Sequence, residues 1–431
     1  MRLRALPLLL CLASAPALAE PATGHWLVAA DFFGSPRYFI MNVTDKGGTL
    51  TGDFDGDTLT GTLAGGAITF HGADPKGGFE DAKATLDASG LHGEIAFVWS
   101  GAKDRTPEKA TFTATRIVEH VGPPQRHEFT PTAFHREFSA KIPPVLHIGP
   151  RDTVHTWTVD AGGFDATGVR RSGGGNPQTG PFYVDGAMPG DTLAIHIDKL
   201  RLNRDYAIST NGIVPRALDS DHAQDYPDAK VGEARWKLDR VKGLASPAEP
   251  GEHLKSYAVP VRPMLGCVAV ARQGAAPPTG DSGEFGGNMD FNEIREGATV
   301  MLPVENPGAL LYVGDAHALQ GDGETTGDAL ETSMDVTFTV EVIAKHGMPD
   351  PRVENATHLI ALGYAGSLDE AVRAATTNMS KWLTERYGLT APEIAEVLGS
   401  VAEYKITEVA DRNAGIALSI ARSALKTLPA K

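Results

Sequence analysis

Residues 310–324 read LLYVGDAHALQGDGE, an apolar β-type run that leads directly into a polar segment spaced by glycine. The same pattern of short apolar runs interrupted by Gly, Pro and Asp extends from residue 24 to about residue 345. The chain holds 48 glycines and 29 prolines in 431 residues, without the regular period of a collagen. Short strands bounded by such turn residues predict a mainly β protein rather than a helical bundle.

The polar half of this stretch carries five groups that bind metals or exchange protons. Asp315 and His317 would lie on one face if the chain stays extended there, because side chains alternate between the faces of a strand. An Asp/His pair with further carboxylates supplies ligands for Zn²⁺, and the carboxylates alone would suit Ca²⁺. The alternative is an ordinary polar loop, because Gly-Asp-Gly tripeptides are common in turns. Spacing alone leaves both interpretations open. The five groups are Asp315, His317, Gln320, Asp322 and Glu324.

Two other β-type runs also lead into polar side chains. Asp160 ends the run 153–159, and the glycine pair at 286–287 is followed by Asn288 and Asp290. A carboxylate beside a buried strand is costly unless it is paired or bound to a metal. These positions are therefore candidate site residues.

Charge and missing motifs exclude several classes of protein. The formal net charge is −15, from 39 basic and 54 acidic residues, which disfavours binding to nucleic acid or to anionic lipid. No Gly-x-Ser-x-Gly elbow is present, which argues against a serine hydrolase of that class. The glycine-rich segment 171–176 lacks the ending of a phosphate loop, and we expect it to be a mobile loop.

The first 19 residues have the three-part pattern of a secretory signal peptide. Two arginines precede a short apolar core, and Ala17 and Ala19 occupy the −3 and −1 positions. The core is too short, and too interrupted by proline, for a membrane anchor. We therefore expect a periplasmic or secreted protein that begins at Glu20.

Cys267 is then the one cysteine of the mature chain, and its apolar surroundings predict a buried strand residue rather than a nucleophile.

The chain divides into regions that differ in their pattern of apolar runs and turn residues. Residues 24–116 predict a β-rich accessory domain, a small barrel or sandwich, in which 53–57 is an acidic hairpin turn rather than a calcium loop. Residues 121–126 predict a linker, and 127–431 form the second domain. Capping boxes at 367–370 and 390–393 predict two C-terminal helices.

Three segments resemble hallmark motifs of the acetamidase/formamidase family and occur in that family's order. They are 180–193 (GPFYVDGAMPGDTL), 286–290 (GGNMD) and 314–324 (GDAHALQGDGE). Asp160 falls where the family's early strand-end aspartate would. The resemblance covers about 127–430 and leaves out 24–116. It implies a core of β-sandwich and barrel-like pieces with a small α/β part.

The resemblance also implies metal-dependent hydrolysis of a short linear amide to a carboxylic acid and ammonia. The metal, Zn²⁺ or Ca²⁺, would be bound by Asp160, Asp290, Asp315 and His317. The bound metal, or Asn288 as a hydrogen-bond donor, would polarise the amide carbonyl. Glu331 or Asp322 would carry the proton from water to the departing nitrogen, and Gln320 would contact the substrate.

A second hypothesis from another class is a non-catalytic protein that holds a ligand or Ca²⁺ on the same β scaffold. The complete set of Asp290, Asp315 and His317 favours the enzyme. As partners we expect a small amide substrate, no nucleic acid and no membrane, with a homodimer as the assembly.

Overall fold

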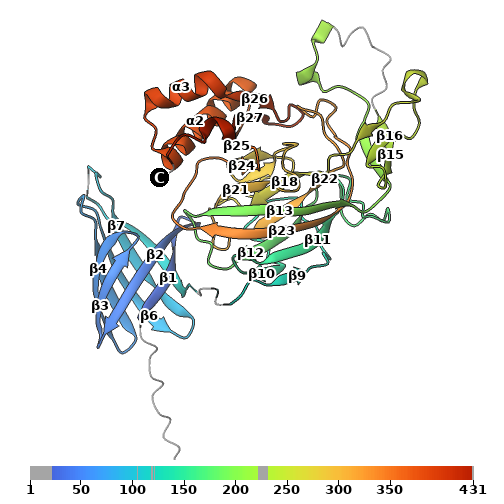
Figure 1. The fold of residues 1–431 in the computed structure, drawn as a ribbon. Coiled ribbons are helices and arrows are strands. Elements are labelled where there is room, and N and C mark those ends of the chain that lie inside the picture. Colours follow the sequence, from blue (N-terminus) through green and yellow to red (C-terminus); the bar gives the residue numbers. More distant parts are fainter. Residues whose placement is uncertain (1–21, 104, 118–119, 121, 222–231, 430–431) are drawn as a thin grey trace, which may run out of the picture. The chain divides into compact units, whose positions relative to one another are not determined.

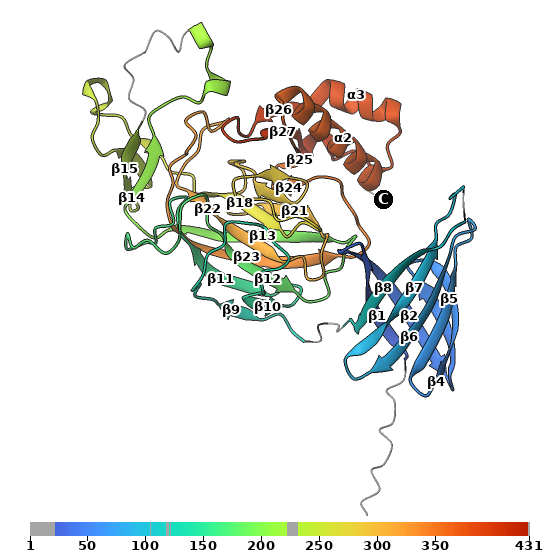
Figure 2. The ribbon, with the colours of Figure 1, turned by 180° about the vertical axis from the view of Figure 1, so that it is seen from behind.

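The computed structural model describes residues 22–429 except 104, 118–119, 121 and 222–231. The chain divides into two compact units, residues 1–117 and 118–431 (Figures 1 and 2). The predicted signal peptide, 1–19, lies outside the described residues, as does one residue of the predicted linker. The expectation of a mainly β protein is confirmed.

The first unit is a closed, eight-stranded antiparallel barrel (Figure 2). Each strand pairs with its neighbour in sequence, and β8 closes the barrel by pairing with β1. Of the barrel and the sandwich that the sequence left open, the barrel is the one formed. Its strands are β1 (Gly24–Phe32), β2 (Ser35–Lys46), β3 (Thr49–Phe54), β4 (Asp57–Ala64), β5 (Ala67–Ala73), β6 (Phe79–Asp87), β7 (Gly90–Val98) and β8 (Glu108–Arg116).

The acidic segment 53–57 is the hairpin turn between β3 and β4, as predicted. Its two central residues, Asp55 and Gly56, have φ of 52° and 101°. Positive φ at both positions is the requirement of a type I′ turn, whose twist matches that of the flanking strands. Asp55 and Gly56 are therefore explained by local backbone geometry.

One carboxyl group lies inside the barrel. Glu80 on β6 is 8% exposed. Burial raises the pKa of Glu80 to about 7, and the neighbouring carboxylates of Asp57 and Asp74 act in the same direction. The folded barrel therefore holds a proton on Glu80 at pH values where an unfolded chain would have released it.

This proton makes barrel stability depend on pH. The ordinary pKa of glutamate is 4.5 and the folded value is about 7, so the stabilisation is complete below pH 4.5 and is lost as pH rises through 7. Glu80→Gln keeps the shape and removes the charge. We expect it to stabilise the barrel at pH 8 by about 1 to 3 kcal/mol and to have little effect at pH 4.5.

Hydrogen exchange of the β5 and β6 amides in the full chain measures this difference, with variant and wild type compared at each pH. Glu94→Gln is the matched control, because Glu94 is exposed on the neighbouring strand β7. Equal protection of Glu80→Gln and wild type at pH 8 would contradict a buried, protonated Glu80.

The second unit is built from three sheets and a pair of helices (Figure 1). A six-stranded sheet has the order β10-β12-β22-β18-β20-β19, a nine-stranded sheet the order β26-β27-β25-β24-β21-β13-β23-β11-β9, and a four-stranded sheet the order β14-β15-β16-β17. One hydrophobic core joins the first two sheets, with Val268 and Val313 from the smaller and Ile195 and Phe338 from the larger. This is the sandwich arrangement that was expected.

The strands of this unit are mostly short, as the glycine and proline content predicts. Their bounds are β9 (Arg126–Glu128), β10 (Leu146–Ile148), β11 (Thr153–Thr158), β12 (Thr179–Val184), β13 (Thr192–Leu202), β14 (Tyr206–Thr210), β15 (Glu233–Asp239), β16 (Leu244–Pro247), β17 (Val259–Pro260), β18 (Met264–Val270), β19 (Ser282–Gly283), β20 (Gly286–Asn288), β21 (Thr299–Pro303), β22 (Leu311–His317), β23 (Met334–Ile343), β24 (Arg352–Glu354), β25 (His358–Ala365), β26 (Glu403–Ile406) and β27 (Ala414–Ala421).

Both predicted C-terminal helices are present. Helix α2 (Leu368–Tyr387) begins after Ser367, whose side chain accepts from the backbone N–H of Glu370, and α3 (Ala391–Val401) begins with the full capping box of Thr390 and Glu393. The apolar face of α2 packs on β25 and β27. Shorter helices are η1 (Pro215–Ala217), η2 (Glu252–Leu254) and α4 (Arg422–Leu425). Among the described residues, no helix is long and apolar enough to span a membrane.

The six-stranded sheet positions the polar residues that the sequence singled out. Strand β22 pairs with β18, and β18 pairs with β20. All seven residues of β22 are buried. Asp315 and His317 on β22 and Asn288 on β20 thus belong to strands that flank β18 in the interior of the unit.

Candidate active site

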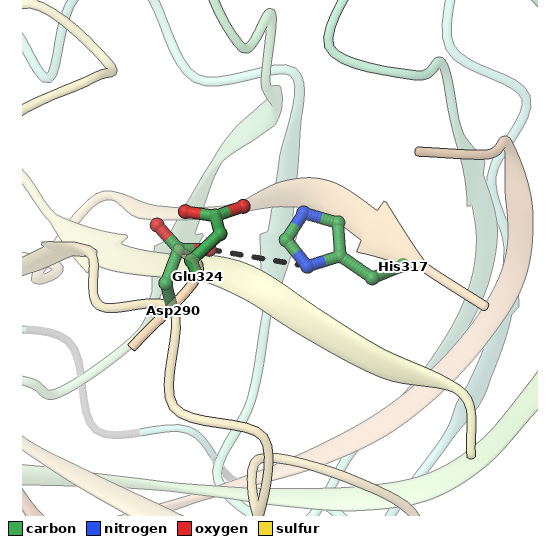
Figure 3. Close-up of side chains that lie close together, drawn as sticks. All are labelled: Asp290, His317 and Glu324. Carbon is green, nitrogen blue, oxygen red and sulfur yellow. Dashed lines mark ion pairs between the residues drawn. The ribbon is translucent and has the colours of Figure 1, made fainter. Parts of the chain in front are cut away.

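Among the described residues of the second unit, two groups of side chains converge closely enough to hold a metal ion, and both contain His317. One group is Asp290, His317 and Glu324, shown in Figure 3, and the other is Asp315, His317 and Glu331. All five side chains are buried. Asp290 follows β20, Glu324 follows β22, and Glu331 precedes β23, so the site is assembled from separate strand ends.

The two nitrogens of His317 face different carboxylates. Nε2 lies 3.0 Å from Oε1 of Glu331 and 3.6 Å from Oδ2 of Asp315. Nδ1 lies 3.9 Å from Oδ1 of Asp290, the ion pair drawn in Figure 3. One buried imidazole is therefore shared by carboxylates on both of its edges.

Gln320 determines which nitrogen of His317 carries the proton. The amide NH₂ of Gln320 donates to the backbone oxygens of Asp290 (2.5 Å) and Thr407 (3.3 Å). Its Oε1, 2.9 Å from Nδ1 of His317, must therefore accept, so Nδ1 is the donor. In the neutral imidazole Nε2 is then free to bind a cation between Asp315 and Glu331. The prediction that Gln320 contacts substrate is untested, and in this geometry it orients His317.

Several buried atoms of the site have no hydrogen-bond partner. They are Oδ1 of Asp290, Oδ1 of Asp315, Nε2 of His317 and Oε2 of Glu331. A buried polar group without a partner is costly, and native proteins rarely leave several together. This set, three carboxylate oxygens and one imidazole nitrogen, has the chemistry of a divalent-cation site.

Gly266 on β18 leaves the space into which the site side chains point. A methyl group there would lie 2.5 Å from Oδ2 of Asp315, 2.6 Å from Oδ1 of Asp290 and 3.0 Å from Cε1 of His317. These distances are too short for a real contact, so any side chain at 266 would displace the carboxylates. The absence of a side chain at this position is a requirement of the site.

The backbone at the site is strained. Ten described non-glycine residues have positive φ, and four of them belong to the site: Asn176, Asp290, Asp315 and Glu324, with φ of 40° to 53°. Such conformations are disfavoured for residues with a side chain and cluster at functional sites. The condition under which Asp315 and His317 would share a face, an extended backbone, is not met at Asp315 with its φ of 53°, although both side chains still meet at one site.

Crowding of the carboxylates shifts their pKa values. Burial and the charge of Asp315 raise the pKa of Asp290 well above its ordinary value, and burial and the charge of Asp290 do the same for Glu324. Burial raises the pKa of Glu331 to about 8, opposed by His317. Burial lowers the pKa of His317, but Glu331 and Asp315 outweigh it and the net direction is upward. The site therefore retains protons or takes up a cation.

Asp160, one of the four predicted metal ligands, is not in either group. Its Oδ2 lies 2.7 Å from Nη2 of Arg204, which is 3% exposed. Its Oδ1 accepts from the backbone N–H of Phe164. A buried carboxylate is thus neutralised by a buried guanidinium, which satisfies the electrostatic requirement without a metal.

Asp322 also lies away from the cluster. Its side chain is 56% exposed, 3.0 Å from Nζ of Lys405, and accepts from Asn292. Glu324, two residues later, points into the site instead, because the chain turns through positive φ at Gly323 and at Glu324 itself. The spacing of acidic residues in the sequence does not reveal which one turns inward.

Asn288 lies at the site with both N–H groups in use. Its Nδ2 donates to Asp290 (2.7 Å) and Asp411 (2.5 Å), while its Oδ1 accepts from Asn176 and from the thiol of Cys267. In this arrangement Asn288 holds two carboxylates in place. The predicted donation to a substrate carbonyl would require one of these bonds to break.

The sequence interpretation missed three residues at the site. Asn176, in the glycine-rich segment, donates to Asp315 (3.3 Å) as well as to Asn288. Glu408 and Asp411 come from the segment between β26 and β27, and burial raises their pKa values to about 8 and about 6. No motif marked them, since they are brought to the site by the pairing of β25 with β27.

Cys267 is buried on β18, as expected. Burial, together with the charges of Asp315 and Asp290, raises the pKa of its thiol well above the ordinary value. A thiolate is the reactive form of cysteine, so this environment disfavours Cys267 as a nucleophile.

Three comparisons with known proteins agree on one family. Residues 237–386 match the model of the acetamidase/formamidase family. A candidate formamidase of Schizosaccharomyces pombe is 37% identical over 91 residues, which are 21% of this chain and 22% of that protein. The match thus covers less than a quarter of that relative.

Two solved structures match over most of their length. An acetamidase/formamidase from the thermophile Thermoanaerobacter tengcongensis has 27% identity and a TM-score of 0.61, covering 71% of this chain and 99% of that one. The acetamidase from Bacillus halodurans has 26% identity and a TM-score of 0.60, covering 70% and 99%. With the three motifs and the sandwich of the second unit, these matches show that the second unit is similar to proteins of the acetamidase/formamidase family.

Proposed function

We propose that the protein hydrolyses a short linear amide to a carboxylic acid and ammonia, with a divalent cation held by Asp315, His317 and Glu331. One observation carries the proposal. Nε2 of His317 is buried and unpartnered between two carboxylates, while the bond to Gln320 keeps the proton on Nδ1. Similarity to the acetamidase/formamidase family supports the reaction type.

The ligand set favours Zn²⁺ over Ca²⁺. Zinc accepts a mixed set of imidazole nitrogen and carboxylate oxygen, whereas calcium takes oxygen ligands, six to eight of them. The same point argues against the alternative of a calcium-binding protein, because His317 belongs to both groups that could hold an ion.

A bound divalent cation would supply Lewis acidity, which activates water near neutral pH and polarises a carbonyl. The carboxyl groups beside it would handle the protons. Asp290 and Glu324 have pKa values well above the ordinary range because of burial and mutual repulsion, so protons can reside there at neutral pH. When water adds to the carbonyl carbon, a carboxylate of the cluster in its ionised form would accept the proton of the water, and a protonated carboxyl group would donate a proton to the nitrogen as the C–N bond breaks, so that the number of protons on the cluster is unchanged.

The burial of the site favours small substrates. Asp290, Asp315, His317, Glu324 and Glu331 are between 0% and 6% exposed. A peptide bond within a folded chain cannot approach groups buried to this extent, whereas an amide of a few atoms can. The proposed substrates are therefore formamide, acetamide and similar short amides.

The direct test is metal analysis of the purified full chain combined with an ammonia-release assay on formamide, acetamide and propionamide. We expect about one zinc per chain and activity that a chelator removes and zinc restores. A metal-free protein with full activity would overturn the metal assignment, and a zinc-loaded protein without activity on any short amide would overturn the amidase.

Ligand substitutions should remove metal and turnover together. His317→Ala and Asp315→Ala each delete one member of a single coordination sphere, so we expect loss of bound zinc and at least a hundredfold fall in kcat/KM. Asp322→Ala is the matched control, because Asp322 is exposed and outside both groups. Full zinc content and normal turnover in His317→Ala would refute the site.

Loss of the group that carries the proton should lower turnover without removing the metal. Glu324→Gln keeps the acceptor for the backbone N–H of Ala329 and removes the titratable group. We expect zinc content near that of the wild type and a roughly hundred- to ten-thousand-fold fall in turnover. Asp322→Asn controls for the loss of one negative charge nearby in sequence. Normal turnover in Glu324→Gln would assign proton transfer to another group.

Gly266→Ala tests the space that the site requires. Gly266 is not among the positive-φ glycines, so alanine fits its backbone, but the methyl group would displace Asp290 and Asp315. We expect a folded protein that has lost zinc and amide hydrolysis. Gly321→Ala is the matched control, since no atom lies within 4 Å of a methyl group there. Unchanged zinc affinity in Gly266→Ala would contradict the geometry of the site.

A further inference from the structure

A small cavity lies in the barrel, far in sequence from the amidase site. Its volume is about 150 Å³, enough for about five water-sized groups at roughly 30 Å³ each. Both carboxyl groups and aromatic rings line it. The lining includes Asp57, Asp74, Glu80, Phe39, Phe54 and Trp99.

Glu80 is the buried polar group of this cavity. It is 8% exposed, and its Oε2 has no hydrogen-bond partner. Oε2 of Glu80 lies beside Gly72 on the neighbouring strand β5, where the Cβ of any other residue would overlap it. Glu80 and Asp57 are close enough for a carboxyl–carboxyl hydrogen bond, and the charge of Asp74 adds to the negative potential. Glu80 thus has one oxygen, Oε2, without a hydrogen bond and lies beside two other carboxyl groups, and such a negative cluster attracts a cation.

Aromatic side chains form another part of the lining. Phe39 stacks on Phe54 with ring centroids 5.3 Å apart, and Trp99 stacks on Phe97 at 5.1 Å. Trp99 is 38% exposed and so has one part open to solvent. The guanidinium of Arg37 lies 5.5 Å from the Trp99 ring centroid, so a ligand cation at this ring would share it with Arg37.

The geometry argues against a metal ion here. Within the described part of the chain, the groups of three ligand atoms close enough to share an ion are the two that contain His317. The carboxylates of the cavity are thus too far apart to surround one small ion, and aromatic rings are not ligands for a hard cation. A larger cation that pairs with a carboxylate on one side and contacts ring faces on the other fits this arrangement.

We propose that the barrel cavity binds a small organic ammonium ion, with Glu80 and Asp57 pairing with its charge and Phe39, Phe54 and Trp99 contacting its alkyl groups. This makes the accessory domain a binding module for amines or methylated ammonium groups. The assignment does not depend on the amidase proposal, because it rests on residues of the first unit alone.

Calorimetric titration of the full chain at pH 7.5 tests the proposal with choline, tetramethylammonium and ethylammonium as probes. The neutral control is 3,3-dimethylbutan-1-ol, which has the shape of choline without the charge. We expect at least one of the ammonium ions to bind in the millimolar range or tighter, and the neutral alcohol to bind at least tenfold more weakly.

Two variants assign the binding to the cavity. Glu80→Gln and Trp99→Leu should each weaken the binding about tenfold or more, while Glu94→Gln on the outer surface should leave it unchanged. Circular dichroism and unfolding curves check that each variant is folded, and Glu80→Gln is expected to be at least as stable as wild type. Amide hydrolysis should not change in any of them.

Three outcomes would overturn the assignment. They are no binding of any ammonium probe at 20 to 50 mM, roughly the upper limit of specific affinity, equal binding of the neutral alcohol, and full affinity in Glu80→Gln. Calcium binding that Glu80→Gln removes would replace the organic cation with a metal.

Discussion

The hydrogen bond from Nδ1 of His317 to Oε1 of Gln320 determines the chemistry of the candidate site. The amide group of Gln320 is fixed by two backbone carbonyls, so its oxygen has to face the imidazole. This places the lone pair of the neutral imidazole on Nε2, between Asp315 and Glu331. Gln320, which the sequence motif suggested as a substrate contact, thus orients His317. Its hydrogen bond leaves Nε2 as the nitrogen that can bind a cation, and Nε2 faces Asp315 and Glu331.

The scaffold around this bond is rigid where the site needs it. Strand β22 is buried along its whole length between β12 and β18, and the core of the sandwich lies beneath it. Such packing can hold Asp290, Asp315 and Glu324 in positive-φ conformations, each of which costs roughly 1 to 3 kcal/mol. Strain of this kind persists because the surrounding structure leaves no relaxed alternative. The strained residues are also those whose carboxylates converge.

The sequence predicted the elements of this protein better than the details of its site. Alternation and turn residues were sufficient for the mainly β fold, for the hairpin at 53–57 and for the two capped helices, because these depend on local backbone preferences. Asp290, Asp315, His317 and Glu331 were predicted and lie together. The motif that contains Asp322 and Glu324 was found, but the choice between the two depends on a turn at Gly323 and Glu324 that no pattern revealed. Asn176, Glu408 and Asp411 are brought to the site by loops and by strand pairings between segments that are distant in sequence. Local patterns along the sequence do not reveal such pairings.

Asp160 illustrates why a buried carboxylate alone does not identify a metal ligand. Its environment and that of Asp315 are similar in burial, at 2% exposed each. Asp160 faces the guanidinium of Arg204, which supplies the compensating charge and the hydrogen bond. Among the described residues, the ion-pair partner of Asp290, Asp315 and Glu331 is one shared imidazole, that of His317. Glu324 lies in the same cluster. Four carboxylates and one imidazole leave a negative excess in a buried space, and the carboxylates relieve it by holding protons or by sharing a divalent cation. The same excess that makes the cluster costly in isolation therefore provides both the affinity for a cation and the protonated carboxyl groups that amide hydrolysis requires.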